Sequence, residues 1–120
     1  SAHYLEENWG GGLDDVPQEL RRILDLQRSG ELLREINPRL QSGDVEGALD
    51  RARAAVTRSP ANDNAHVALA SVQLQMGDRD AAMASLRAAV DLNPGRRTTL
   101  PRDRNFASIY QYADFLRLIG

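Results

Sequence analysis

The sequence predicts an all-α fold, a solenoid in which one helix–turn–helix hairpin occurs twice. The first observation is a fixed spacing, because Gly43 returns as Gly77 and Pro60 returns as Pro94, each 34 positions later. A repeat of this length is typical of stacked supersecondary units. The second observation is the alternation of apolar stripes at helical spacing with Gly, Asp and Pro, which mark helix ends.

Helix ends are marked in the same way in both copies. Gly accepts the left-handed backbone conformation that commonly follows a helix, and the Asp after each Gly can cap the next helix. Asp44 and Asp78 are these caps. Pro60 and Pro94 cannot continue a helix, so they end each hairpin.

These residues resemble the tetratricopeptide repeat family, whose pattern has a Gly-Asp turn, two small residues and a closing Pro. The small residues of this chain are Ala48, Ala55, Ala82 and Ala89. Leu69 and Ala70 also match the family pattern, whereas His66 and Gln73 stand where the family has an aromatic residue and Tyr. The resemblance implies a tetratricopeptide-like domain over residues 16–120, with the repeats and the C-terminal cap at 29–62, 63–96 and 97–120.

The N-terminal part is expected to hold a linker and one helix. Residues 1–15 contain three consecutive Gly residues at 10–12 and are interpreted as a linker or extension. A helix is expected over 16–28, capped by Asp14 or Asp15. Its apolar stripe consists of Leu20, Ile23, Leu24 and Leu26.

The four repeat helices follow in order. Residues 30–42 form the first helix of repeat one, in which Pro38 predicts a kink, and residues 44–58 form the second. Residues 62–76 and 78–92 are the helices of repeat two. The expected core positions of repeat one's second helix are Val45, Ala48, Leu49, Ala52, Ala55 and Val56; those of repeat two are Ala65, Leu69, Val72, Met76, Ala82, Met83, Leu86, Ala89 and Val90.

The tail departs from the repeat. Phe106 and Phe115 have the spacing of a segment seen after terminal tetratricopeptide repeats, which predicts two short helices over the last hairpin. An end repeat leaves an apolar face uncovered, and aromatic side chains can cover it. Tyr110 and Tyr112 are expected in the same cap. The basic stretch 96–104 is interpreted as solvated surface, or as paired with Asp103.

Composition excludes several classes of function. The chain has 120 residues, a formal net charge of −2 and no cysteine, so thiol catalysis and thiolate metal sites are excluded. Mixed charge argues against a general role on nucleic acid or membrane surfaces. No apolar run reaches the roughly 18 residues of a membrane span. The basic residues are all Arg and Ala is abundant, which favours a bacterial source; a cytoplasmic location is the expectation.

Candidate catalytic and ligand-binding motifs are weak. The triple Gly lacks the strand and the Lys-Ser/Thr of a phosphate loop. His3 and His66 are far apart in sequence, so His66 is interpreted as structural, and Asp14 and Asp15 as helix caps. Nothing points to a catalytic residue, cofactor or metal, and we expect a protein that is not an enzyme.

By resemblance, the function is protein–protein interaction, with a peptide or partner helix held in the concave groove formed by the first helices. The expected groove residues are Leu33, Arg34, Asn37, Leu40, Gln41, Asn64, Val67, Ala68, Ser71, Leu74 and Gln75. Two alternatives stay open. The chain can be the C-terminal accessory domain of a larger enzyme, for example a hydrolase, or a module for homo-oligomerisation, because two repeats fall below the roughly three of a stable array.

Part of this groove is expected to be an apolar strip. Val67 and Leu74 share one helix face and are left over from the predicted core, and Leu33 and Leu40 repeat the arrangement 34 residues earlier. Polar neighbours flank the strip, which suits a peptide or helix better than a charged small molecule. The alternative is that the segment 4–9, with its two aromatic residues, covers these positions.

Overall fold

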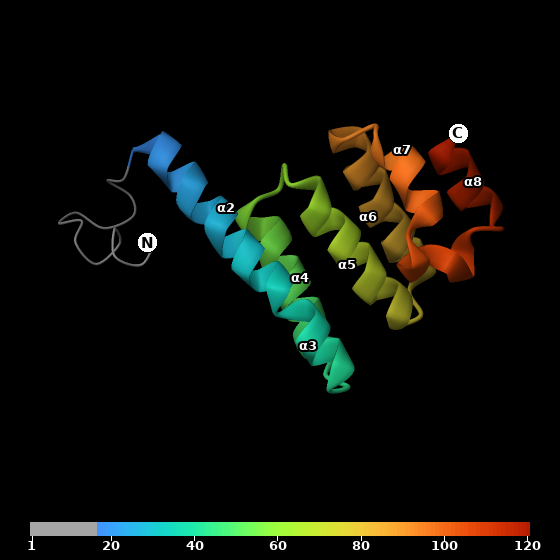
Figure 1. Cartoon of the computed structure of the whole chain (residues 1–120), viewed down its shortest axis with the longest axis horizontal. Coiled ribbons are helices and arrows are strands. Elements are labelled where there is room, and N and C mark those ends of the chain that lie inside the picture. Colours follow the sequence, from blue (N-terminus) through green and yellow to red (C-terminus); the bar gives the residue numbers. More distant parts are fainter. Residues whose placement is uncertain (1–16) are drawn as a thin grey trace.

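The computed structural model describes residues 17–120, and all regular secondary structure in this range is helical, which confirms the predicted class (Figure 1). The predictions for residues 1–16, including the linker and the covering segment 4–9, lie outside the described residues. The elements are α2 (Gln18–Arg34), α3 (Ile36–Gln41), α4 (Val45–Arg58), α5 (Asp63–Gln75), α6 (Arg79–Leu92), α7 (Arg96–Thr99), the 3-10 helices η2 (Leu100–Arg102) and η3 (Arg104–Ile109), and α8 (Ala113–Ile119).

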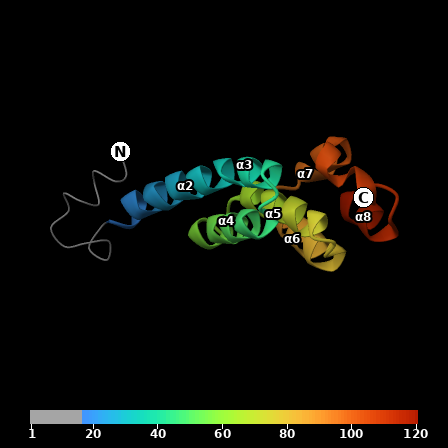
Figure 2. The same ribbon diagram turned by 90° about the horizontal axis from the view of Figure 1, so that it is seen from below.

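The helices form two rows. The first helices of the hairpins, α2–α3 and α5, pack against the second helices, α4 and α6, and α5 also packs against α4 of the preceding hairpin. Seen from below, α2–α3 and α7 lie along one side of the molecule and α4 and α6 along the other (Figure 2). The segment α7–η2 thus begins where the first helix of a third repeat would begin.

Both Gly-Asp turns have the predicted geometry. Gly43 and Gly77 have φ angles of 87° and 83°, in the left-handed region that only Gly adopts freely. The N–H groups of Asp44 and Asp78 donate back to carbonyls five residues earlier, as in a Schellman motif. Each Asp side chain then accepts a hydrogen bond from the first turn of the following helix, at 2.9 Å in repeat one and 3.1 Å in repeat two.

Small residues lie at the helix crossings, as predicted. Ala48, Ala55, Ala82 and Ala89 are all fully buried. The Ser29 hydroxyl, also fully buried, donates to the Ala55 carbonyl at 3.0 Å and joins α2 to α4. The apolar face of α6, consisting of Ala82, Met83, Leu86, Ala89 and Val90, is buried throughout.

The N-terminal helix is not separate from the first helix of repeat one, so that boundary was wrong. Helix α2 continues through Gly30, whose cost of about 1 kcal/mol in a helix is outweighed by packing of Leu32 and Ser29 on α4. The helix instead breaks at Glu35. Pro38 cannot donate to the Arg34 carbonyl and its ring crowds it, so the predicted kink is confirmed.

Three residues predicted in the core are exposed. Ile23, Leu26 and Met76 are 55%, 56% and 45% exposed, whereas Leu24 is buried. Helix α4 ends at Arg58, which pairs with Asp25 at 3.3 Å, so the first turns of α2 extend beyond the end of α4 (Figure 1). Met76 is the C-cap of α5 and therefore lies past its packed face.

The tail covers α6, and the aromatic pair is buried as predicted. Phe106 and Phe115 are fully buried in one cluster with Met83 and Leu86 of α6. Tyr110 packs on Phe115 with ring centroids 5.8 Å apart. Tyr112 stays 41% exposed, contrary to expectation, and its ring lies 4.2 Å from the Arg79 guanidinium carbon. The two predicted short helices correspond to η3 and α8, whereas α7 and η2 were not predicted.

Candidate binding groove

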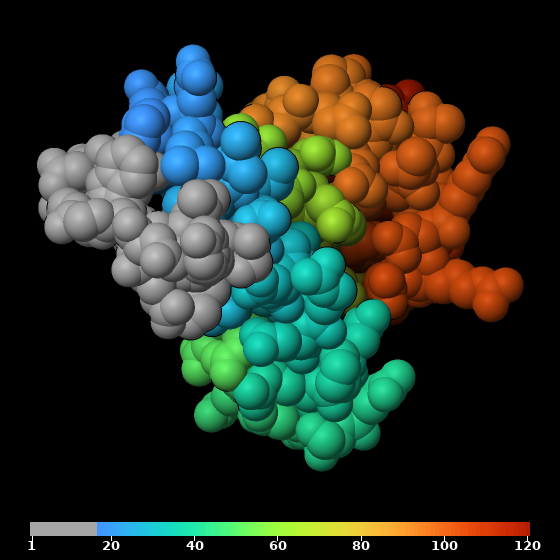
Figure 3. Space-filling model, turned by 60° about the vertical axis from the view of Figure 1, so that its left-hand side comes forward, coloured from blue at the N-terminus to red at the C-terminus, as the bar shows by residue number. Residues whose placement is uncertain are grey.

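A groove lies between α2–α3, α5 and the tail segment from α7 to η3, with a volume of about 250 Å³. In the space-filling view, α5 is recessed between the α2–α3 helices on one side and the α7–η3 segment on the other (Figure 3). The groove is lined by Leu33, Ile36, Asn37, Leu40, Asn64, Val67, Ala68, Ser71, Arg96, Asp103 and Asn105.

Most of the residues that the sequence analysis assigned to a groove line this one. They are Leu33, Asn37, Leu40, Asn64, Val67, Ala68 and Ser71. The other four lie elsewhere. Arg34 faces a separate hollow beside Pro38, Leu74 packs against the core cluster under the tail, and Gln41 and Gln75 are exposed outside the groove lining.

The apolar strip is not an open surface left over from the core. Val67 is only 7% exposed and belongs to the cluster that contains Phe106 and Ile109, and Leu74 packs against the same cluster. The tail covers these positions because η3 packs on α5. The expected continuous strip is therefore wrong; its apolar groups form the floor and edges of a short groove.

Four lining residues were not predicted from the sequence: Ile36, Arg96, Asp103 and Asn105. One signal was available. Asn37, Ser71 and Asn105 follow one another at intervals of 34 residues, so Asn105 continues the repeat register into the tail. The tail departs from the repeat pattern in its other residues, which concealed this third member.

Several polar side chains in the groove have no hydrogen-bond partner among the residues that the structure describes. The side chains of Asn37, Asn64, Ser71 and Asn105 make no hydrogen bond with any residue, as far as the described range 17–120 extends. Each amide offers a donor and an acceptor, and Ser71 a hydroxyl. The groove therefore presents free hydrogen-bonding groups from α3, α5 and η3 at once.

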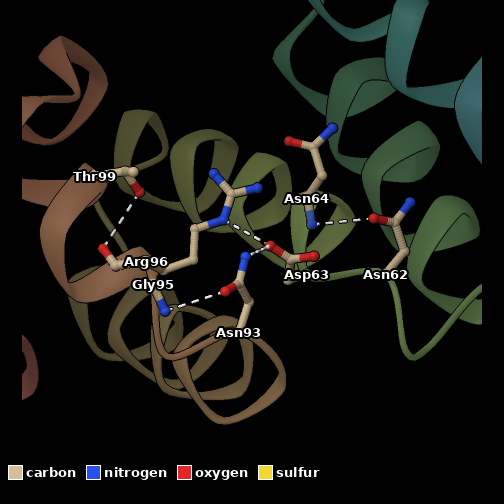
Figure 4. Close-up of polar contacts among 7 residues, drawn as sticks. All are labelled: Asn62, Asp63, Asn64, Asn93, Gly95, Arg96 and Thr99. Atoms are coloured by element: carbon tan, nitrogen blue, oxygen red, sulfur yellow. Dashed lines mark hydrogen bonds and ion pairs between the residues drawn. The ribbon is translucent and has the colours of Figure 1, made fainter.

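An ion pair joins the tail to the N-terminal end of α5 (Figure 4). The Arg96 Nε donates to Asp63 Oδ2 at 2.7 Å, and the Asn93 Nδ2 donates to the same oxygen at 3.1 Å. Burial alone would raise the pKa of the Asp63 carboxyl, but the hydrogen bonds from Arg96 and Asn93 outweigh it and hold the pKa below its ordinary value. Asp63 is therefore ionised at neutral pH.

The basic stretch was interpreted as solvated surface or as paired with Asp103. The Asp103 Oδ1 instead accepts the Asn105 N–H at 3.0 Å and caps η3, so that pairing is wrong. Across residues 17–120, the arginines 97, 102 and 104 are exposed and make no ion pair, as expected of solvated surface. Positive charge therefore gathers on the tail segment that borders the groove.

His66 has the structural role expected of it. Its Nε2 lies 2.7 Å from the Pro60 carbonyl oxygen, which joins α5 to the loop before it. Gln73, the other departure from the family pattern, accepts a hydrogen bond from Ser85 at 2.7 Å and links α5 to α6. Within residues 17–120, no group of three or more His, Cys, Asp or Glu side chains could hold a metal ion.

Helix hairpins stacked in register, with a groove along their first helices, define a helical-repeat protein. A model of the tetratricopeptide repeat family matches residues 39–98, half of the chain, and the protein belongs to this family. Tetratricopeptide repeats generally mediate protein–protein interaction and are typically not catalytic.

The other comparisons add no relative to this assignment. Neither the curated proteins nor the solved structures that were compared include a significant match to the chain. None of the helices described, from residue 17 onward, is both long and apolar enough to span a membrane.

Proposed function

We propose that this protein binds an extended segment of a protein partner in the groove between α2–α3, α5 and η3. The observation that carries the proposal is the set of free polar side chains there, Asn37, Asn64, Ser71 and Asn105. An extended main chain exposes N–H and C=O groups that such amides and hydroxyls can satisfy. The half-buried side chains of Leu33 and Leu40 offer apolar contact beside them.

The size of the groove favours an extended segment over a helix. An α-helix with its side chains is about 10–12 Å across. The groove holds about 250 Å³ and is bounded on one side by the tail, and its apolar residue Val67 is almost fully covered. A single extended chain fits such a space with fewer unfilled gaps. The partner segment is therefore expected to carry alternating polar and small apolar side chains.

The test is selection from a random library of 12-residue peptides, each flanked by Gly-Ser spacers so that neither peptide terminus is free. Enriched peptides are then measured against a variant in which Asn37→Tyr and Asn64→Tyr fill the groove. Both positions are exposed, so the fold should tolerate the change. We expect binding to fall at least about tenfold, because the new side chains occupy the ligand's space.

A matched control places two tyrosines on the opposite row of helices, as Thr57→Tyr and Ala84→Tyr, both exposed. This variant should bind the selected peptides as the wild type does. The proposal fails if no peptide is enriched, or if the groove-filled protein binds as tightly as the control. Melting temperatures of both variants show that the fold is intact.

A further inference from the structure

We infer that Arg96 is a carboxylate-binding residue of this groove, and that the partner segment carries an Asp or Glu side chain at that point. The inference deepens the proposed function and rests on it, since it names the chemistry of the ligand in the same groove. Arg96 lines the groove and is held in place by Asp63 of α5.

The Arg96 guanidinium is only partly used within the protein. Its Nε donates to Asp63, while its two terminal nitrogens make no hydrogen bond within residues 17–120. Figure 4 shows both terminal nitrogens pointing away from the Asp63 carboxylate. A guanidinium offers five N–H donors in a planar fork that matches a carboxylate. The unused edge of this fork can therefore take a second carboxylate.

The position of Arg96 is fixed before any ligand arrives. Asp63 is itself held by Asn93, whose Oδ1 accepts the Gly95 N–H at 3.1 Å. Thr99 donates to the Arg96 carbonyl at 3.4 Å, and the Arg96 side chain is 23% exposed (Figure 4). A side chain already ordered loses little conformational entropy on binding. The arrangement is therefore preorganised for its ligand.

The surrounding charge favours an acidic ligand. Four arginines lie between residues 96 and 104, against one acidic residue, Asp103. Of the four, only Arg96 makes an ion pair within residues 17–120, and its partner Asp63 neutralises one charge. The remaining excess is positive, although Asp103 also lines the groove. Opposite charge of this kind sets partner choice and speeds association. A partner segment with net positive charge would be repelled by this excess of positive charge.

Groove amides near this end can bind the main chain beside the acidic residue. Asn64 follows Asp63 on α5, and Asn105 lies on η3 within the same groove. Both amides are free of other partners, as described above. The partner's acidic side chain would bind Arg96, and the main-chain groups beside it would bind these two amides. Together these contacts give the partner segment a defined register in the groove.

The experiment uses the peptides selected above, in the full chain. Asp or Glu should be enriched at one position, and replacing it by Asn or Gln in the peptide should weaken binding at least about tenfold, as for hydrogen bonds to charged groups. Arg96→Gln should weaken binding of the acidic peptide similarly. Arg96→Lys should bind at an intermediate level, since it keeps the charge without the fork.

Two features separate ligand binding from a structural effect. In Arg96→Gln, the acidic and the amide peptides should bind equally, because the interaction between the two groups is gone. The control Arg97→Gln removes an equal charge from an exposed neighbour that does not line the groove and should change affinity less than about threefold.

The outcomes of the two proposals are distinct. The role of Arg96 would be overturned if the selected peptides need an open groove but show no preference for Asp or Glu. It would also be overturned if Arg97→Gln weakens their binding as much as Arg96→Gln does. Either result would leave the proposed groove binding intact. Absence of any groove-dependent peptide would instead overturn the proposed function.

Discussion

The two repeats share their turns but differ in what covers them. Each has a left-handed Gly, a capping Asp and buried Ala at its crossings. In repeat two, the tail encloses α6 and adds Leu100, Phe106 and Phe115 to one large cluster. Repeat one instead has smaller clusters and surface ion pairs, such as Glu35 with Arg51 at 3.0 Å. The shared Gly-Asp motif and the buried alanines determine the geometry of each hairpin, whereas the elements that cover a hairpin determine its stability.

The largest effect is expected in the tail cluster. Phe106→Ala should lower the free energy of unfolding by about 3–5 kcal/mol, because it leaves a cavity in a fully buried site. Chemical denaturation measures the change. Leu116→Ala, on an exposed side chain of α8, should change stability by less than about 0.5 kcal/mol. Equal effects of the two variants would contradict the covering role of the tail.

The next prediction concerns what the repeats share. Ala48 and Ala82 occupy the same position of the two copies and are both fully buried. Ala48→Leu and Ala82→Leu should each overpack a crossing and destabilise the protein by about 1–3 kcal/mol. Ala84→Leu, at an exposed position of α6, is the control. An unchanged midpoint for either buried site would show that the repeats are not equivalent there.

A smaller effect should appear where the tail is tied to repeat two. Because the pKa of Asp63 is lowered in the folded state, its contribution is present above the unfolded pKa of about 3.9 and is lost as pH falls through the folded value. Asp63→Asn should therefore cost about 1 kcal/mol at pH 7 and progressively less as the pH falls below about 3.9. Thermal unfolding measured from neutral pH into this acidic range tests the prediction. A difference that grows on acidification would contradict the sign.

The smallest effect should appear at Gly47, where repeat two has Ala81. A Cβ at Gly47 would clash with the Asp44 carboxylate, which also pairs with Arg39 at 2.9 Å. The Gly47 N–H, and then Arg39, lower the pKa of Asp44. Gly47→Ala should move the pKa of Asp44 back toward its ordinary value. The net change in stability should stay below about 1 kcal/mol, because the better helix propensity of Ala offsets the lost contacts. Carbon-detected NMR titration measures the pKa. An unchanged Asp44 pKa would show that the Asp44 carboxylate keeps its hydrogen bonds when a methyl group is added at residue 47.

The hairpins could be predicted from the sequence because their signals are local and occur twice. Gly43, Asp44 and the crossing alanines act through backbone geometry and size, so their spacing alone identifies them. The continuation of α2 through Gly30 could not be predicted in this way. Gly30 is a weak helix former, and only its neighbour Ser29, bonded to Ala55, shows why the helix continues.

The groove was predictable in part. The free faces of α3 and α5 follow from helix periodicity, which selected Asn37, Asn64 and Ser71, and these three residues line the groove. The contribution of the tail depends on how residues 93–106 run across α5, and that path is set by long-range contacts such as Arg96 with Asp63. For the same reason, the sequence could not show that Val67 is covered.

The central claim is that a ligand lies between repeat one and the tail, over α5. A selected peptide with a nitroxide spin label at its middle tests this most directly, through the loss of amide NMR signals near the label. The account predicts loss at Asn37, Ser71 and Asn105 together, with signals of Thr57 and Ala84 retained. Loss confined to α4 and α6, with the three groove signals intact, would contradict it.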